Sequence, residues 1–159
     1  MKLDFRYHAQ PEDVATVREI LESSGFFLPH EVPEAINLLN DKLQKGNNSA
    51  YHFIFAETAG NVTGYICYGL MSCSILSYGV YFLAVHEQYR AQHIGKQLLL
   101  KAEEKIKERN GKNIFIETAS KPLYEPTRKF YHKMNYTIEA VLKDFYDVND
   151  DKVIFSKHF

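Results

Sequence analysis

The chain has 159 residues, 45% of them hydrophobic and 25% charged, with a formal net charge of −1. These values are typical of a single soluble globular domain, residues 1–159, and exclude a nucleic-acid binder held by bulk positive charge. No apolar run is long enough to span a bilayer, and the N-terminal residues lack the apolar core of a signal peptide. We therefore expect a cytoplasmic protein with no membrane and no nucleic-acid partner.

The first half of the chain predicts two helices that follow a short strand, Leu3–His8. The first helix begins at Gln10-Pro11, because proline is favoured at the first helical position, and it ends at Gly25. The second covers Pro33–Lys45, where apolar residues recur at helical spacing, and Gly46 ends it. Two strands follow, Tyr51–Glu57 and Val62–Leu70, joined by the hairpin signal Ala59-Gly60-Asn61.

The second half alternates strands and helices. We expect strands over Ile75–Val85 and Asn113–Thr118, with an amphipathic helix over Ile94–Arg109 between them. A short helix and two closing strands complete the chain, over Pro126–Met134, Tyr136–Phe145 and Lys152–Lys157. This order predicts an α+β fold with one central mixed β-sheet flanked by helices.

The connection between Val85 and the following helix is the most informative part of the chain. A strand, a short glycine-containing turn and a helix N-terminus form a site for an anion. The first N–H groups of a helix have no partner inside it, and the helix dipole is positive there. Arg90, His93 and Lys96 add side-chain donors. The segment predicts a phosphate-bearing ligand, although an ordinary turn with solvated basic residues explains it equally well when taken alone.

A second segment, Tyr124–Tyr136, combines a short helix carrying Phe130-Tyr131 with a turn at Asn135. In this order and separation, the two segments resemble the GNAT superfamily of N-acetyltransferases. That family's first pattern is Arg/Gln-x-x-Gly-x-Gly/Ala, whose backbone amides hold the pyrophosphate of acetyl-CoA. The positions of this pattern are filled here by Arg90, Ala91, Gln92, His93, Ile94 and Gly95.

Several positions depart from the family patterns. His93 stands at the first glycine, where its imidazole could crowd the pyrophosphate or, pointed outward, donate to it. A positive φ there would be uncommon for a non-glycine residue, although histidine is among those that tolerate it. In the second segment Tyr124 replaces asparagine, Thr127 replaces alanine, and Asn135-Tyr136 replaces Gly-Phe. Asparagine is the other residue that tolerates a positive φ at a helix end.

The resemblance covers essentially the whole chain and implies a GNAT-like fold that uses acetyl-CoA as the acyl-donor cosubstrate. Backbone groups of the strand ending at Val85 would pair with the pantetheine arm, and an N–H near Val85 would polarise the thioester oxygen. The implied cofactor-binding residues are Leu83, Ala84, Val85, Arg90, Ala91, Gln92, His93, Ile94, Gly95, Lys96 and Tyr124.

Tyr131 is the residue that the family uses against the departing sulfur. A thiol has a pKa of about 8.5 and a tyrosine about 10, so full proton transfer to the thiolate is uphill by roughly 2 kcal/mol. We therefore predict a hydrogen bond that stabilises developing charge; a structural core tyrosine is the alternative. An alkylamine acceptor must also lose a proton. Glu117 is the first candidate for the base, ahead of Asp144 and Glu87.

The predicted function is transfer of an acetyl group directly to the amine of a small molecule, an amino-acid derivative or a peptide. The alternative is a non-catalytic acyl-CoA-binding module with a regulatory role, suggested by His93. Aromatic and acidic residues of the expected acceptor side suit a cationic amine, although the aspartates are explained more simply as a solvated turn: Phe26, Phe27, Tyr146, Asp144, Asp147, Asp150 and Asp151.

Other site types are disfavoured. The P-loop and dinucleotide-binding glycine patterns are absent, and the seven histidines are scattered, so we expect no metal. Cys67 and Cys73 lack metal-ligand spacing, and we expect two buried or half-buried reduced thiols rather than a disulfide. A homodimer is allowed, although no apolar stripe in the sequence requires one.

Overall fold

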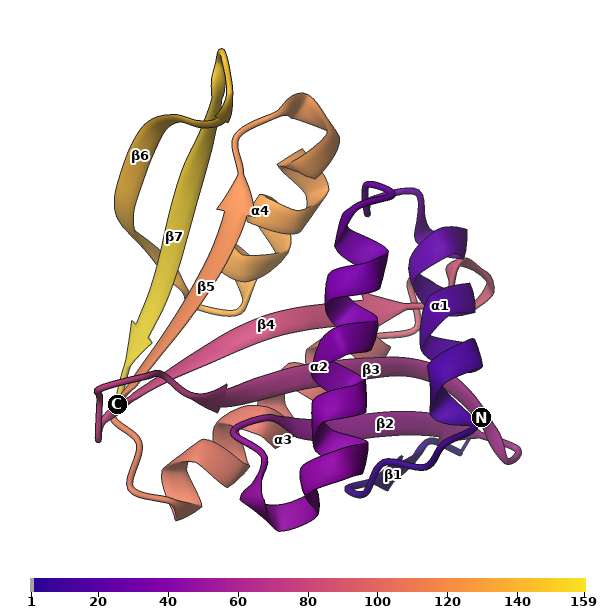
Figure 1. Ribbon diagram of the computed structural model, residues 1–159. Helices are drawn as coiled ribbons and strands as arrows, with labels where there is room; N and C mark the ends of the chain where they lie inside the picture. Colours follow the sequence, from indigo (N-terminus) through magenta and orange to yellow (C-terminus); the bar gives the residue numbers. More distant parts are fainter. Residues whose placement is uncertain (1) are drawn as a thin grey trace. The chain divides into compact units, whose positions relative to one another are not determined.

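The structure, a computed structural model, describes residues 2–159 and has its helices and strands in the predicted order (Figure 1). The helices are α1 (Asp13–Ser24), α2 (Glu31–Lys45), α3 (Ile94–Glu108) and α4 (Glu125–Lys133). Three 3₁₀ turns, not predicted, are η1 (Gly46–Asn48), η2 (Glu87–Tyr89) and η3 (Pro122–Tyr124). The strands are β1 (Asp4–Arg6), β2 (His52–Thr58), β3 (Asn61–Leu70), β4 (Ser77–Val85), β5 (Asn113–Ala119), β6 (Thr137–Asp147) and β7 (Asp150–His158).

The strands form one mixed sheet in the order β1-β2-β3-β4-β5-β7-β6, which confirms the predicted α+β class. β4 pairs parallel to β5, whereas β1–β2, β2–β3, β5–β7 and β6–β7 pair antiparallel. The chain divides into two compact units. The first contains the residues up to Gly69 together with Phe82–Lys105, and the second contains Leu70–Tyr81 with Ile106–Phe159.

In the first unit, α1 and α2 lie side by side over one face of β2 and β3 (Figure 1). The buried positions of α1 recur at helical spacing, and Gly25 ends the helix with φ 74°. The core of the first unit is aliphatic and aromatic, and its buried residues include Val17, Ile20, Leu21, Leu39, Phe53, Phe55 and Tyr65. The start of α1 is held to β1 and β2 by Arg6, which pairs with Asp13 at 2.8 Å and with Glu57 at 2.6 Å.

Several predicted boundaries differ from the structure, and for three of them the contacts show the cause. α1 begins at Asp13 because the Asp13 carboxylate accepts a hydrogen bond from the backbone N–H of Gln10 at 2.7 Å. α2 begins at Glu31, before Pro33, since the Glu31 carboxylate accepts from the N–H of Leu28 at 2.6 Å and proline is tolerated in a first turn. β4 begins at Ser77, because residues 71–77 form a turn that leaves Ile75 85% exposed.

In the second unit, β6 and β7 form a hairpin beside β5, and α4 packs its aromatic residues against it. Tyr131 of α4 lies with its ring centroid 6.0 Å from Tyr136 and 5.6 Å from Phe155. β6 is exposed along nearly its whole length. Five of its large apolar residues are exposed: Ile138, Val141, Leu142, Phe145 and Tyr146.

Both cysteines are free thiols, as predicted. Cys67 is buried, and burial raises its pKa well above the ordinary value. The expectation for Cys73 was wrong: it is exposed, because it lies in the turn before β4, where it takes φ 64°. Within residues 2–159, no helix is both long and apolar enough to cross a membrane. The same residues bring together no group of three His, Cys, Asp or Glu side chains that could hold a metal ion.

Candidate functional site

The predicted phosphate turn lies between β4 and α3. After η2, the backbone takes a left-handed conformation twice, at Ala91 with φ 61° and at His93 with φ 60°. The positive φ considered for His93 is thus observed. Residues 90–93 are exposed, while Ile94 is buried and begins a helix of 15 residues.

The turn has the properties of an anion site. No acidic residue lies in the first turn of α3, so no carboxylate of that turn competes for the positive end of the helix dipole. Left-handed residues in a turn direct successive backbone N–H groups into a concavity that binds anions. Lys96, one turn into α3, is exposed and adds a cation. The geometry therefore fits a phosphate group held by backbone amides.

Gly64 of β3 lets the end of β4 approach closely, a feature that the sequence analysis did not single out. A Cβ built on Gly64 would lie 2.9 Å from the carbonyl oxygen of Ala84 and 3.2 Å from Cγ2 of Val85. The N–H of His86 donates to the carbonyl of Thr63 at 2.8 Å, so β3 holds β4 at this point. The backbone at Val85, from which an N–H donor is expected, is thus fixed by its neighbour.

Arg90 was expected among the cofactor-binding residues, and the structure shows what its side chain contacts. The guanidinium donates to the carbonyl oxygen of Ser24, the last residue of α1. Its Cζ lies 4.8 Å from the centroid of the Phe26 ring. The charged group therefore contacts the connection between α1 and α2.

In the second unit, Tyr131 lies in α4 and is buried, with 6% of its surface exposed. Burial raises its pKa well above that of an exposed tyrosine. Asn135 follows α4 with φ 67°, so asparagine takes the left-handed position expected of it. Tyr124 lies at the start of the same helix, partly buried.

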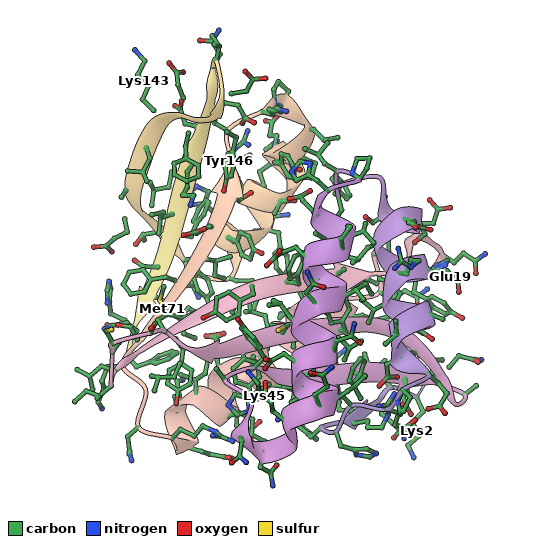
Figure 2. All side chains as sticks on the ribbon, in the orientation of Figure 1. Lys2, Glu19, Lys45, Met71, Lys143 and Tyr146 are labelled. Atoms are coloured by element: carbon green, nitrogen blue, oxygen red, sulfur yellow. The ribbon has the colours of Figure 1, made fainter. Side chains whose placement is uncertain are left out.

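Glu117 of β5 is the predicted base, and its side chain is half exposed. One carboxylate oxygen, Oε2, lies 3.1 Å from Nζ of Lys152 on β7. The Lys152 ammonium also lies 3.7 Å from the Phe145 ring centroid and 5.8 Å from that of Tyr146, which Figure 2 labels. Only 12% of the Lys152 side chain is exposed. Sequence reasoning missed this lysine; the one available signal was its alternation with apolar Val153 in a predicted strand.

The aspartates of the β6–β7 hairpin hold the turn. Asp144 accepts from the N–H of Asn149 at 2.9 Å, and Asp151 accepts from the N–H of Asp144 at the same distance. Asp150 is buried and pairs with Lys121 at 3.4 Å. These contacts support the simpler interpretation of the acidic residues as part of a turn. The Asp144 carboxylate is thus engaged within the turn.

Other proteins share this arrangement. The structure superposes on a crystal structure from Desulfovibrio desulfuricans described as an acetyltransferase of the GNAT family. The TM-score is 0.96 and the sequence identity 35%, over 99% of both chains. A PaiA N-acetyltransferase from Thermoplasma acidophilum in complex with coenzyme A gives a TM-score of 0.77 at 22% identity, over 100% of both chains.

More distant structures have the same fold. The ribosomal-protein-S18-alanine N-acetyltransferase from Escherichia coli gives a TM-score of 0.77 at 14% identity, over 99% of this chain and 94% of that one. A search of curated proteins gave no match. The sequence profile described as the acetyltransferase (GNAT) family matches residues 14–136. This chain therefore belongs to the GNAT family of acetyltransferases.

Proposed function

We propose that the protein is an acetyl-CoA-dependent N-acetyltransferase. The observation that carries the proposal is the turn at residues 90–93, with two left-handed residues leading into a helix N-terminus that has no acid in its first turn. Two structures of the same fold, the PaiA enzyme and an aminoglycoside 6'-N-acetyltransferase, were solved with coenzyme A. Backbone amides of residues 91–95 would hold the pyrophosphate, with Lys96 as an added cation.

The strand β4 would hold the pantetheine arm. Backbone groups of Leu83–Val85 are proposed to pair with its amides, and the N–H near Val85 to polarise the thioester oxygen. The donor, when bound, supplies an acetyl group that the acceptor amine takes as the thiol leaves. Gly64 supports this role, because the backbone that must present the donor is held in place before any ligand arrives.

Tyr131 is proposed to stabilise the departing sulfur. Proton transfer from an exposed tyrosine to the thiolate is already uphill by roughly 2 kcal/mol. Because burial raises the pKa of Tyr131, transfer from this phenol is less favourable still. A hydrogen bond from the neutral phenol to the developing thiolate is therefore favoured over complete proton transfer. Tyr124, at the start of the same helix, is kept as a proposed cofactor contact.

Glu117 is proposed to take the proton of the acceptor amine, directly or through water. Its half-exposed carboxylate is accessible, and the Lys152 ammonium, 3.1 Å from Oε2, holds it in place. The acceptor class is proposed to be a small amine, an amino-acid derivative or a peptide amine. The two free thiols suit a reducing compartment, and we place the reaction in the cytoplasm. A homodimer stays a prediction.

Thermal unfolding with increasing acetyl-CoA tests the proposal, with ATP and NAD as controls. At a hundredfold excess over the dissociation constant, binding adds about 2.7 kcal/mol. For a chain of this size that raises the unfolding temperature by about 5–10 °C. A rise with acetyl-CoA alone supports the proposed cosubstrate, and no rise contradicts it. Thiol release across an amine panel then separates an enzyme from a non-catalytic acyl-CoA-binding module, since only an enzyme turns over.

A further inference from the structure

We infer that Arg90 is a positioning residue that latches the α1–α2 connection to the β4–α3 turn. This inference rests on the proposed function in one respect: the turn that Arg90 belongs to is the proposed pyrophosphate site. The first observation is the bond from its guanidinium to the carbonyl of Ser24, 66 residues away in the chain. The second is the Phe26 ring beneath the same guanidinium.

The electrostatics of α1 explain why a cation is used here. The last carbonyl groups of a helix have no partner inside it, and the helix dipole is negative at that end. α1 has no basic residue in its own last turn. Arg90 therefore supplies the missing positive charge from another element, and its planar guanidinium can bond the carbonyl while stacking on the ring.

Further contacts join α1 to the segment that follows β4. The N–H of Glu87 donates to the Ser23 hydroxyl at 3.3 Å, and Nε2 of His86 lies 3.5 Å from a carboxylate oxygen of Glu19. Figure 2 labels Glu19 on α1. Phe27, which follows Phe26 in the α1–α2 connection, packs on β4, with its ring centroid 6.1 Å from that of Phe82. Both phenylalanines of the α1–α2 connection are thus held by the segment that carries the proposed cosubstrate site.

This arrangement separates two roles that a basic residue in the turn could have. A phosphate ligand contributes to acetyl-CoA affinity, and its loss leaves the α1–α2 connection unchanged. A latch orders Phe26 and Phe27, which follow α1 and were expected on the acceptor side. Its loss should weaken binding of the acceptor amine and leave the phosphate site in place. The structure assigns Arg90 to the second role and leaves the first to the backbone amides and Lys96.

The test compares Arg90→Met with Lys96→Met, which removes an exposed cation from the same region. Hydrogen exchange at amides 25–28 is followed in both ligand-free proteins. We expect exchange at least threefold faster in Arg90→Met and unchanged in Lys96→Met. Phe26→Leu, which removes the ring under the guanidinium, should also accelerate exchange, and Arg90→Lys should restore part of the protection.

The second measurement is ligand binding. Arg90→Met should keep the dissociation constant of acetyl-CoA within about threefold of wild type and raise the KM of the acceptor amine. Unchanged exchange at amides 25–28, or a loss of acetyl-CoA affinity beyond tenfold, would overturn the latch. Failure of wild type to bind acetyl-CoA would contradict the proposed function, yet the exchange comparison would still decide the role of Arg90.

Discussion

Replacing Gly64 by alanine tests whether the close approach of β3 to β4 holds the end of β4 in place. The added Cβ would lie 2.9 Å from the Ala84 carbonyl oxygen and 3.3 Å from Cγ2 of Ile94, so backbone must move. Overpacking of this kind costs about 1–3 kcal/mol. Loss of glycine flexibility in the unfolded chain stabilises by about 0.4–1 kcal/mol. The net expectation is destabilisation by about 1–2 kcal/mol.

That change lowers the unfolding temperature by about 2–8 °C for a chain of this size. Because Ala84 and Val85 carry the proposed contacts to the cosubstrate, acetyl-CoA affinity should fall as well. Gly79→Ala is the matched control, since its nearest neighbour is the ring of Tyr81, 38% exposed and able to turn away. Thermal unfolding and calorimetric titration measure both effects. Equal unfolding temperatures for the two variants, with wild-type affinity in Gly64→Ala, would refute the reasoning.

Three further predictions concern single side chains. Tyr131→Phe should lower kcat much more than acetyl-CoA affinity, and equal losses would remove its catalytic role. Since burial raises the pKa of Tyr131, the phenol keeps its proton to higher pH, so kcat should show no decline from its ionisation below about pH 10. Lys152→Met removes the ammonium that lies 3.1 Å from the Glu117 carboxylate and holds it in place, so kcat should fall; Lys143→Met, on the same hairpin, should leave kcat unchanged. Arg6→Met leaves the buried Asp13 carboxylate without its cationic partner and should cost about 3–5 kcal/mol by urea unfolding, against little change for Lys2→Met at an exposed pair.

The features that the sequence predicts well have local signals. The turn before α3 is predicted from a strand pattern, a glycine and basic residues that lie within a dozen positions. The left-handed conformation of Asn135 is predicted because asparagine, like glycine, is favoured just after a helix ends. Boundaries were less accurate where a side chain bonds a backbone group just outside the helix, as Glu31 does with the N–H of Leu28.

Contacts between distant segments could not be predicted. The pair between Glu117 and Lys152 depends on the register of β5 with β7, and a shift by one residue would reverse the face of every side chain. The bond from Arg90 to Ser24 depends on where α1 ends relative to the turn after β4, and nothing within either segment indicates the other. Nothing in the sequence around Gly64 indicates that the backbone of Ala84 lies against it.

The left-handed conformations of Ala91 and His93 have a consequence for the kinetics of ligand capture. A residue with a Cβ has fewer backbone states than glycine, so this turn stays close to one shape while empty and loses less entropy when a phosphate arrives. The same Cβ makes that shape cost of order 1 kcal/mol in the empty protein. Glycine at position 93 would relieve this strain, but its added freedom in the unfolded chain costs about 0.4–1 kcal/mol, so the folding stability should change little. It would also slow productive association, because the turn would have to find its binding shape after encounter.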